Sequence, residues 1–224
     1  MVLGDARQVG PEAPPAVTVY RLANLTYQWS GDDLLLRKIA AGADVLLLVE
    51  ARDAGNRPVD VAGILGREWS VSQDRTSGAT AGSVIAVRRR NVKLRWSLAR
   101  LLSPAGRDVQ DRYKRAAAIR PRNGKTARVM VFHSPLPKTG RQGDAIESAL
   151  RWVDRQRKRG KRWLVACDGN MPYRALQSDL DAPHAYGEDV MAFCWGHGWG
   201  EVETSAERYD GTDHHVLTLT TKES

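Results

Sequence analysis

Apolar and polar residues follow two different periods along this chain, and each change of period marks an expected element. Residues 17–22 alternate with period two and are rich in β-branched side chains, which predicts a strand ending near Asn24. Residues 35–40 place apolar side chains at helical spacing, and Gly42 is positioned to end that helix. The apolar run between Asp44 and Glu50 predicts a strand buried on both faces. A strand, a helix and a strand in this order predict an α/β fold.

The rest of the pattern predicts short strands and one long helix. The helix is expected at 142–159, where the apolar residues recur at i, i+3, i+4 and i+7. No linker divides the chain, so we expect a flexible tail over residues 1–15 and one domain over residues 16–224. The other strands are expected at 64–71, 83–89, 115–119, 127–133, 163–167, 190–195, 201–204 and 215–220, with a hairpin turn at 121–124.

Composition narrows the class of protein. The chain has 224 residues, of which 42% are hydrophobic and 27% charged, as in ordinary globular proteins. Its longest apolar stretch, residues 45–49, is far shorter than the roughly 20 residues of a membrane span, and no signal peptide is visible. Two cysteines, Cys167 and Cys194, exclude a disulfide scaffold, suit a reducing cytoplasm and are expected to be buried free thiols.

The charge is unevenly distributed. The net charge is +8, yet residues 88–128 alone hold 14 basic and 2 acidic residues. Residues 151–162 hold 7 basic and 1 acidic residue, whereas residues 163–224 hold 3 basic and 11 acidic residues. Two basic blocks indicate a polyanionic partner, of which nucleic acid is the commonest. The alternative is a solvated basic face with no specific partner.

Polar residues stand at the ends of several predicted strands. Ligands of α/β proteins bind outside the carboxyl ends of the strands, so residues distant in sequence can converge on one site there. Their oxygen atoms suit a hard cation, Mg²⁺ above all, and a histidine beside it can transfer protons near neutral pH. These strand-end residues are Asn24, Glu50, His133, Asp168, Asn170, Asp213 and His214.

Taken in order, these residues and their surroundings resemble the endonuclease/exonuclease/phosphatase superfamily. The matching segments are LLLVE ending at Glu50, VMVFHSPLP around His133, VACDGNM around Asp168 and TDHHV around His214. With Asn24 they match the superfamily in order and spacing over residues 17–219, nearly the whole chain. The resemblance implies a four-layered sandwich of two packed mixed β-sheets flanked by helices.

The resemblance also implies a metal centre. Asn24 and Glu50 match the first metal-binding pair of the superfamily, and Asp213 matches a further metal ligand. The implied cofactor is Mg²⁺, with Mn²⁺ as a second candidate. Such a cation neutralises the phosphate oxygens that would repel an attacking water.

The remaining roles concern proton transfer and the phosphate. The resemblance implies that His214 is the general base, oriented by Asp189, with Asp168 as the rival base. Asp168 and Asn170 match residues that position the attacking water and contact the phosphate or the metal, and His133 would stabilise the transition state.

The chain departs from the superfamily pattern near these residues. Cys167 replaces a glycine, Gly169 replaces a phenylalanine and Thr212 replaces a serine. The acidic partner that one branch provides for His133 has no clear counterpart, Glu68 being the nearest acidic residue.

The expected function is Mg²⁺-dependent hydrolysis of the backbone of DNA or RNA by in-line attack of water, without a covalent intermediate. The alternatives are hydrolysis of a small phosphorylated molecule, and a nucleic-acid-binding protein of this fold with weak catalysis. We expect no membrane and no obligate protein partner. The residues expected to contact nucleic acid are Arg88, Arg89, Arg90, Lys93, Arg112, Lys114 and Arg115.

Overall fold

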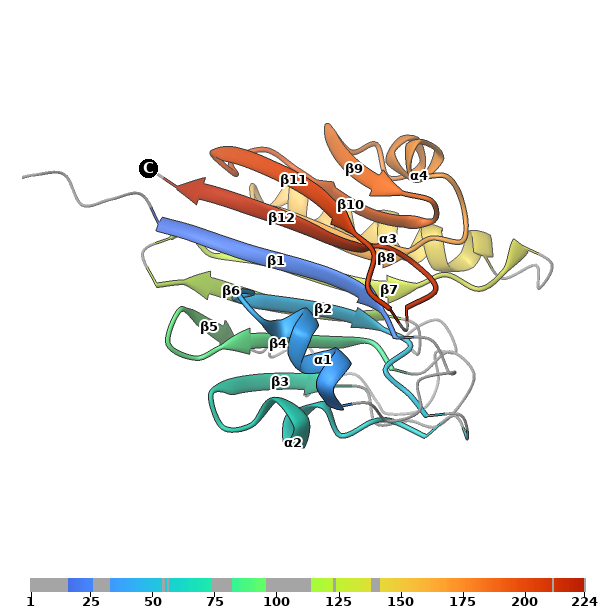
Figure 1. Ribbon diagram of the computed structural model, residues 1–224. Coiled ribbons are helices and arrows are strands. Elements are labelled where there is room, and N and C mark those ends of the chain that lie inside the picture. Colours follow the sequence, from blue (N-terminus) through green and yellow to red (C-terminus); the bar gives the residue numbers. More distant parts are fainter. Residues whose placement is uncertain are drawn as a thin grey trace, which may run out of the picture.

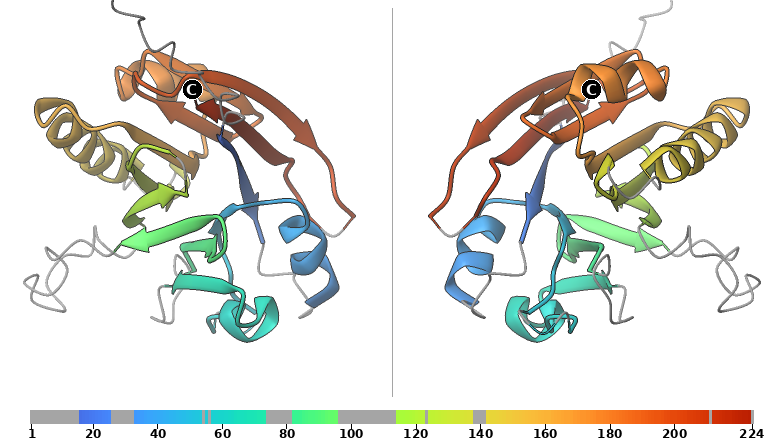
Figure 2. Two further views of the ribbon diagram at one scale, coloured as in Figure 1. Left: turned by 90° about the vertical axis from the view of Figure 1, so that its left-hand side faces the viewer. Right: turned by 90° about the vertical axis from the view of Figure 1, so that its right-hand side faces the viewer.

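Two six-stranded β-sheets pack face to face, and helices cover the outer face of each (Figures 1 and 2). The computed structural model describes residues 16–25, 33–53, 55, 57–73, 82–95, 114–122, 124–137, 142–210 and 212–223. The expected tail at residues 1–15 lies outside these ranges. Within them, no helix combines the length and the apolar character needed to cross a membrane.

The first sheet has the strand order β11-β12-β1-β2-β4-β3. Two helices, α1 (Asp33–Ala40) and α2 (Val61–Leu65), cover its outer face. The strands are β1 (Ala16–Asn24), β2 (Val45–Val49), β3 (Trp69–Gln73), β4 (Val84–Arg88), β11 (Glu201–Glu207) and β12 (Val216–Glu223).

The second sheet has the strand order β5-β6-β7-β8-β10-β9. Its outer face packs against α3 (Gln142–Lys158) and α4 (Tyr173–Asp179). The strands are β5 (Val92–Arg95), β6 (Lys114–Pro121), β7 (Ala127–His133), β8 (Trp163–Asp168), β9 (His184–Glu188) and β10 (Met191–Trp195). Helix, sheet, sheet and helix form the four layers that the sequence predicted.

Side chains alternate between the two faces of each strand, so the two sheets form three apolar clusters. One lies between the sheets, and one lies under the helices on the outer face of each sheet. In β2, Val45, Leu47 and Val49 face the core between the sheets, whereas Leu46 and Leu48 face α1 and α2. The central strands of the second sheet divide in the same way, with their outward residues packed under α3 and α4. Because both faces of these strands are covered, their sequences are almost continuously apolar.

Each sheet contains one parallel strand pair. β1 pairs in parallel with β2, and β7 pairs in parallel with β8, whereas the other pairings between described strands are antiparallel. The carboxyl ends of a parallel pair lie at the same edge of the sheet. We call the end of the sandwich where these four strands finish the carboxyl end.

The structure corrects one predicted strand. Residues 64–71 were expected to form a single strand, but α2 ends at Leu65 and β3 begins at Trp69. The carboxylate of Asp60 accepts a hydrogen bond from the Gly63 amide at 3.2 Å and caps a short helix. Gly66, with a φ of 76°, then ends that helix. Four described elements were not predicted: α2, β5, α4 and β9.

Both cysteines are free and fully buried, as the composition predicted. Cys167 lies on β8 and Cys194 on β10, on the outward side that α3 and α4 cover. Burial raises the pKa of the Cys194 thiol to about 12 and holds the pKa of the Cys167 thiol well above its usual value. Because the thiolate is the reactive form, neither side chain is a nucleophile in the folded protein.

The thiols should therefore be inert until the chain unfolds. We expect no reaction of Cys167 or Cys194 with Ellman's reagent at pH 8 in buffer, and full reaction of both in guanidinium chloride. Rapid labelling of the folded chain would contradict the buried placement of these residues.

Candidate active site

In three strands, the row of apolar side chains that faces the core between the sheets ends in a polar residue. Asn24 ends such a row in β1, His133 in β7 and Asp168 in β8. Since side chains on one face of a strand recur every second residue, each of the three points into the space between the sheets at the carboxyl end. The rows that precede them are Tyr20 and Leu22, then Val129 and Val131, then Leu164 and Ala166.

Glu50 reaches the same space through an unusual backbone turn. It directly follows β2 and has a φ of 52°, in the left-handed region that glutamate rarely adopts. The next amide, that of Ala51, donates to the carbonyl of Gly82 at 3.1 Å. Gly82 has a φ of 106°, and a Cβ at this position would lie 2.6 Å from the Ala51 nitrogen. The turn that carries Glu50 therefore requires glycine at position 82.

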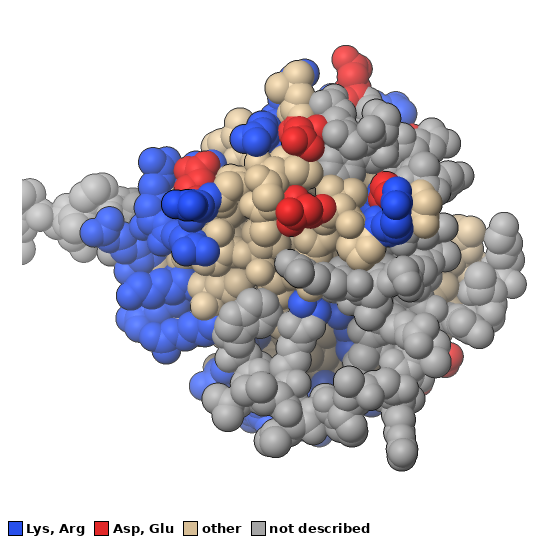
Figure 3. All heavy atoms as spheres, turned by 90° about the horizontal axis from the view of Figure 1, so that it is seen from below, with Lys and Arg blue, Asp and Glu red and all other residues tan. Residues whose placement is uncertain are grey.

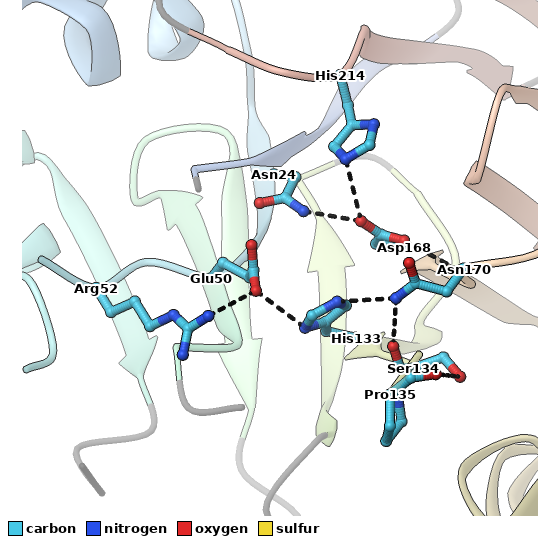
Figure 4. A network of polar contacts seen from close by, with 9 residues as sticks. All are labelled: Asn24, Glu50, Arg52, His133, Ser134, Pro135, Asp168, Asn170 and His214. Atoms are coloured by element: carbon cyan, nitrogen blue, oxygen red, sulfur yellow. Dashed lines mark hydrogen bonds and ion pairs between the residues drawn. The ribbon is translucent and has the colours of Figure 1, made fainter. Parts of the chain in front are cut away.

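A buried hydrogen bond joins the two sheets at this end. The side-chain nitrogen Nδ2 of Asn24 donates to Oδ2 of Asp168 at 2.8 Å (Figure 4). The backbone amide of Asn170 donates to Oδ1 of Asp168 at 3.1 Å. Nε2 of His214 lies 3.7 Å from Oδ2 of Asp168. Asp168 is thus a carboxylate only 1% exposed that faces three nitrogen-bearing groups.

His133 is held between a carboxylate and an amide. Its Nε2 lies 3.1 Å from Nδ2 of Asn170, and its Nδ1 lies 3.4 Å from Oε1 of Glu50. The same Asn170 nitrogen also donates to the carbonyl of Ser134, which fixes the orientation of the amide. With Asn170 donating, Nε2 of His133 is the acceptor, and the proton of the neutral ring is on Nδ1, facing Glu50.

Arg52 and Gln142 also contact the residues of the candidate site. Nη2 of Arg52 donates to Oε1 of Glu50 at 2.8 Å, with both side chains almost fully buried. Nε2 of Gln142, at the start of α3, donates to the carbonyls of Gly169 and Asn170 at 3.1 and 3.0 Å. Neither residue was predicted from the sequence. Arg52 stands two positions after Glu50, but Gln142 approaches Asn170 only through the fold.

Solved structures share this arrangement of elements. D. rerio TDP2, complexed with a single-stranded DNA product, superposes with a TM-score of 0.61 at 14% identity over 92% of this chain and 99% of that one. The human Nocturnin catalytic domain with a bound sulfate anion gives 0.62 at 13% identity over 94% and 96%. An endonuclease/exonuclease/phosphatase family protein from Bacteroides thetaiotaomicron gives 0.63 at 10% identity over 95% and 100%. No protein-family model and no curated protein sequence matches the chain significantly.

The chain has the endonuclease/exonuclease/phosphatase fold. The family resemblance inferred from the strand-end residues is thereby confirmed for the fold. Asn24, Glu50, His133, Asp168, Asn170 and His214 come from five separate segments of this fold, and Figure 4 shows them around one space.

Two of the residues to which the sequence assigned roles in the site do not form the predicted contacts. Asp213, which precedes His214, is exposed and forms no hydrogen bond or ion pair with Asn24 or Glu50 among the described residues. Asp189 lies 3.5 Å from Nδ1 of His215, and not beside His214. The two neighbouring histidines therefore have different acidic partners, His215 facing Asp189 and His214 facing Asp168. Glu68 pairs with Arg88 and is no partner for His133.

The predicted nucleic-acid contacts at residues 88–93 lie away from the candidate site, whereas Lys114 and Arg115 begin β6 at its end of the sandwich. Arg88 and Arg89 bond to the backbone carbonyls of Ala43 and Trp69 at 3.1 and 3.0 Å. β4 runs antiparallel to β2, so this end of β4 points away from Glu50. Arg115 donates to Ser72 on β3 at 2.8 Å, and Lys114 donates to Ser148 on α3. Arg90 and Lys93 are exposed at the end of the sandwich opposite Glu50. Arg112 lies outside the described residues.

The site fits a hard divalent cation. Oδ1 of Asn24 is buried and has no hydrogen-bond partner, and Figure 4 shows it turned toward the carboxylate of Glu50. Within the described ranges, no three His, Cys, Asp or Glu side chains converge as a metal cage. Mg²⁺ does not require one, because it keeps several waters and binds through one or two carboxylates together with substrate phosphates. Asn24 and Glu50 are the residues that would hold it.

Metal binding should be measurable without any substrate. At about ten times its Kd, Mg²⁺ should stabilise the chain by about 1.4 kcal/mol, which raises Tm by roughly 3–5 °C. Differential scanning fluorimetry should show this shift in the parent chain and its loss in Asn24→Ala and Glu50→Gln. Asp179→Asn, which removes an exposed carboxylate on α4, is the control and should keep the shift. An unchanged shift in both site variants would exclude this metal position.

Replacement of Gly82 should distort the turn that carries Glu50. Gly82→Ala forces an unfavourable φ and a backbone clash, which should cost at least about 2 kcal/mol of unfolding free energy. Gly143→Ala is the matched control, because its Cβ meets nothing within 4 Å and alanine favours the helix. Urea unfolding should show a lower midpoint for the first variant and an equal or higher midpoint for the second. Equal stability of Gly82→Ala would refute the tight approach to Ala51.

Proposed function

We propose that the chain is a Mg²⁺-dependent phosphodiesterase that hydrolyses nucleic acid. The observation that carries this proposal is the buried, unpartnered amide oxygen of Asn24 beside the Glu50 carboxylate, a few ångströms from an Asp168 and His214 pair. Asn24 and Glu50 are suitable cation ligands, and Asp168 and His214 beside them can accept a proton. This combination suits metal-assisted hydrolysis. The endonuclease/exonuclease/phosphatase fold of the chain agrees with this chemistry.

Asn24 and Glu50 would hold the cation at the mouth of the space between the sheets. When bound, Mg²⁺ supplies charge that neutralises the phosphoryl oxygens and lowers the pKa of a coordinated water. Glu50 offers one carboxylate oxygen for this, because Arg52 and His133 both face the other, Oε1. The Arg52 pair fixes the direction of that carboxylate before any ligand arrives.

Asp168 and His214 would remove the proton from the attacking water. Their 3.7 Å separation is too long for a direct hydrogen bond but leaves both groups at the same space. Asn24 and the Asn170 amide already donate to Asp168 and fix the direction of its carboxylate. His214 is 27% exposed at its side chain and can pass the proton to solvent.

Asn170 acts here as a positioning residue. A phosphate contact was expected of it, but its side-chain amide nitrogen faces both His133 and the Ser134 carbonyl. These two partners use both hydrogens of the amide. Asn170 therefore sets the direction and the tautomer of His133, whose Nδ1 faces Oε1 of Glu50.

Two observations favour nucleic acid over a small phosphoester as the substrate. The chain carries a net charge of +8, and its basic residues are concentrated in two blocks that are separate in sequence. D. rerio TDP2, which shares the fold, was solved with a single-stranded DNA product. Both are consistent with a polymeric phosphodiester.

Hydrolysis should require the cation and the two strand-end groups. We expect cleavage of a labelled single-stranded 20-mer and of bis(p-nitrophenyl) phosphate with Mg²⁺, and no cleavage with EDTA. Glu50→Gln should lower kcat/KM at least about 100-fold, and His214→Ala about 100- to 10,000-fold. The matched control His197→Ala removes an exposed histidine next to His184 and should change kcat/KM by less than about twofold.

The same assay separates the alternatives. Cleavage of the small diester without cleavage of DNA or RNA would assign a small phosphoester as the substrate. Tight binding of nucleic acid without turnover of either substrate would indicate a binding protein of this fold. Full activity of His214→Ala would refute the proton-transfer role of that residue.

A further inference from the structure

A hollow of about 420 Å³ opens at the end of the sandwich opposite the candidate active site. Five of its eight lining residues are cationic and none is acidic. Seen from below, lysine and arginine gather at this end of the molecule (Figure 3). We call the five cationic residues the far-end basic surface: Arg89, Arg90, Lys93, Arg120 and Arg122.

The strand register separates this surface from the candidate active site. Lys114, at the start of β6, pairs with Phe132, the neighbour of His133. Arg120 lies six residues further along β6, which is about 20 Å at the rise of a β-strand. β4 ends and β5 begins at the same far end, where Val92 pairs with Pro121. The surface is thus outside the reach of a small ligand held at Glu50.

Two cations face each other across neighbouring strands of this surface. Lys93 on β5 is the direct register partner of Arg120 on β6, and both side chains are exposed. Like charges directly opposite each other destabilise a sheet. Among the described residues, none of the five cations of the surface forms an ion pair with a carboxylate. An anionic partner would offset this repulsion.

The backbone that presents these cations is fixed. Nδ2 of Asn91, in the turn between β4 and β5, donates to Oδ1 of the buried Asp44 at 2.5 Å. The amide of Arg122 donates to the Asn91 carbonyl at 2.7 Å, which ties the end of β6 to that turn. A fixed scaffold with mobile cationic side chains binds anions at a low ordering cost.

The second basic block of the sequence reaches the same end. α3 starts beside Gly169 and Asn170 at the carboxyl end and runs to Lys158, shortly before β8 begins. β8 begins at Trp163, which pairs with Arg128 near the start of β7. The exposed Lys158, Arg159 and Lys161 therefore lie at the far end as well. Two blocks that are separate in sequence extend one positive end face.

We propose that the far-end basic surface binds the phosphate backbone of a nucleic-acid strand whose scissile bond lies in the active site. The choice of substrate rests on the proposed function. A small phosphorylated ligand fits less well, because the cations are exposed and spread over several elements rather than converging on one anion. Bridging about 20 Å takes about six nucleotides at the 3.4 Å rise of a stacked strand, so the surface should act only on longer strands.

Binding tests the surface independently of catalysis. The parent is Glu50→Gln in EDTA, and the probe is a fluorescein-labelled single-stranded 20-mer followed by anisotropy from low to high salt. Adding Lys93→Gln and Arg120→Gln should raise Kd about tenfold and reduce the salt slope of log K by about 1.4. The matched control adds Arg37→Gln and Lys38→Gln, which remove the same charge from exposed positions of α1, and should leave Kd within about twofold.

Turnover is the second measurement. It uses the same two pairs of substitutions, introduced into the chain that keeps Glu50. The ratio of kcat/KM for the 20-mer to that for a trinucleotide should fall about tenfold in the Lys93 and Arg120 variant, and not in the control. The variant should melt at or above the temperature of its parent, because a like-charge pair is removed.

The outcomes separate the two proposals. If the Lys93 and Arg120 substitutions raise Kd but the parent chain hydrolyses neither substrate, the binding role of the surface is supported and the proposed function is refuted. Hydrolysis of both substrates with a Kd that the Lys93 and Arg120 substitutions do not change overturns the surface and leaves the proposed function intact. Equal loss of binding in the control pair also overturns the surface, because net charge alone would then account for it.

Discussion

The hydrogen bond from Asn24 to Asp168 is the contact on which the candidate site depends, because it joins the two sheets where their parallel strands end. Antiparallel neighbours would have placed consecutive strand ends at opposite edges of a sheet. One parallel pair in each sheet instead brings four strand ends together, and this buried bond sets the separation between them. The same Asp168 carboxylate accepts from the Asn170 amide and lies 3.7 Å from Nε2 of His214.

The site is organised before any ligand binds, because each buried carboxylate already has a protein partner. Asp168 accepts from Asn24 and the Asn170 amide, and Glu50 accepts from Arg52. A buried carboxylate without such donors would be strongly destabilising. The positive φ of Glu50 costs about 1–2 kcal/mol, which the fold offsets by holding the next amide against Gly82. The groups that the proposed reaction requires therefore do not have to reorganise when substrate arrives.

Periodicity was enough to predict the strand ends that build this site, since Asn24, His133 and Asp168 each complete an apolar row of period two. It could not predict Gln142 or Gly82, whose partners are distant in sequence. Nor could it decide between His214 and His215 for Asp189, because that choice depends on which way each side chain of the segment points. The place of the basic block at 88–95 in the fold depends on strand direction, which sequence alone does not give and which sends the block to the end opposite Glu50.

The separation of positive charge from the candidate metal position has a physical rationale. An arginine close to a carboxylate competes with a divalent cation for the same oxygen, and Arg52 already occupies Oε1 of Glu50. More cations around that carboxylate would weaken Mg²⁺ binding while strengthening the attraction for a polyanion. With the far-end basic surface about 20 Å along β6, the chain can attract a long anion without lowering the affinity of Glu50 for the metal. In the proposed enzyme, capture of the polymer and activation of its scissile phosphate are thus assigned to opposite ends of the same two sheets.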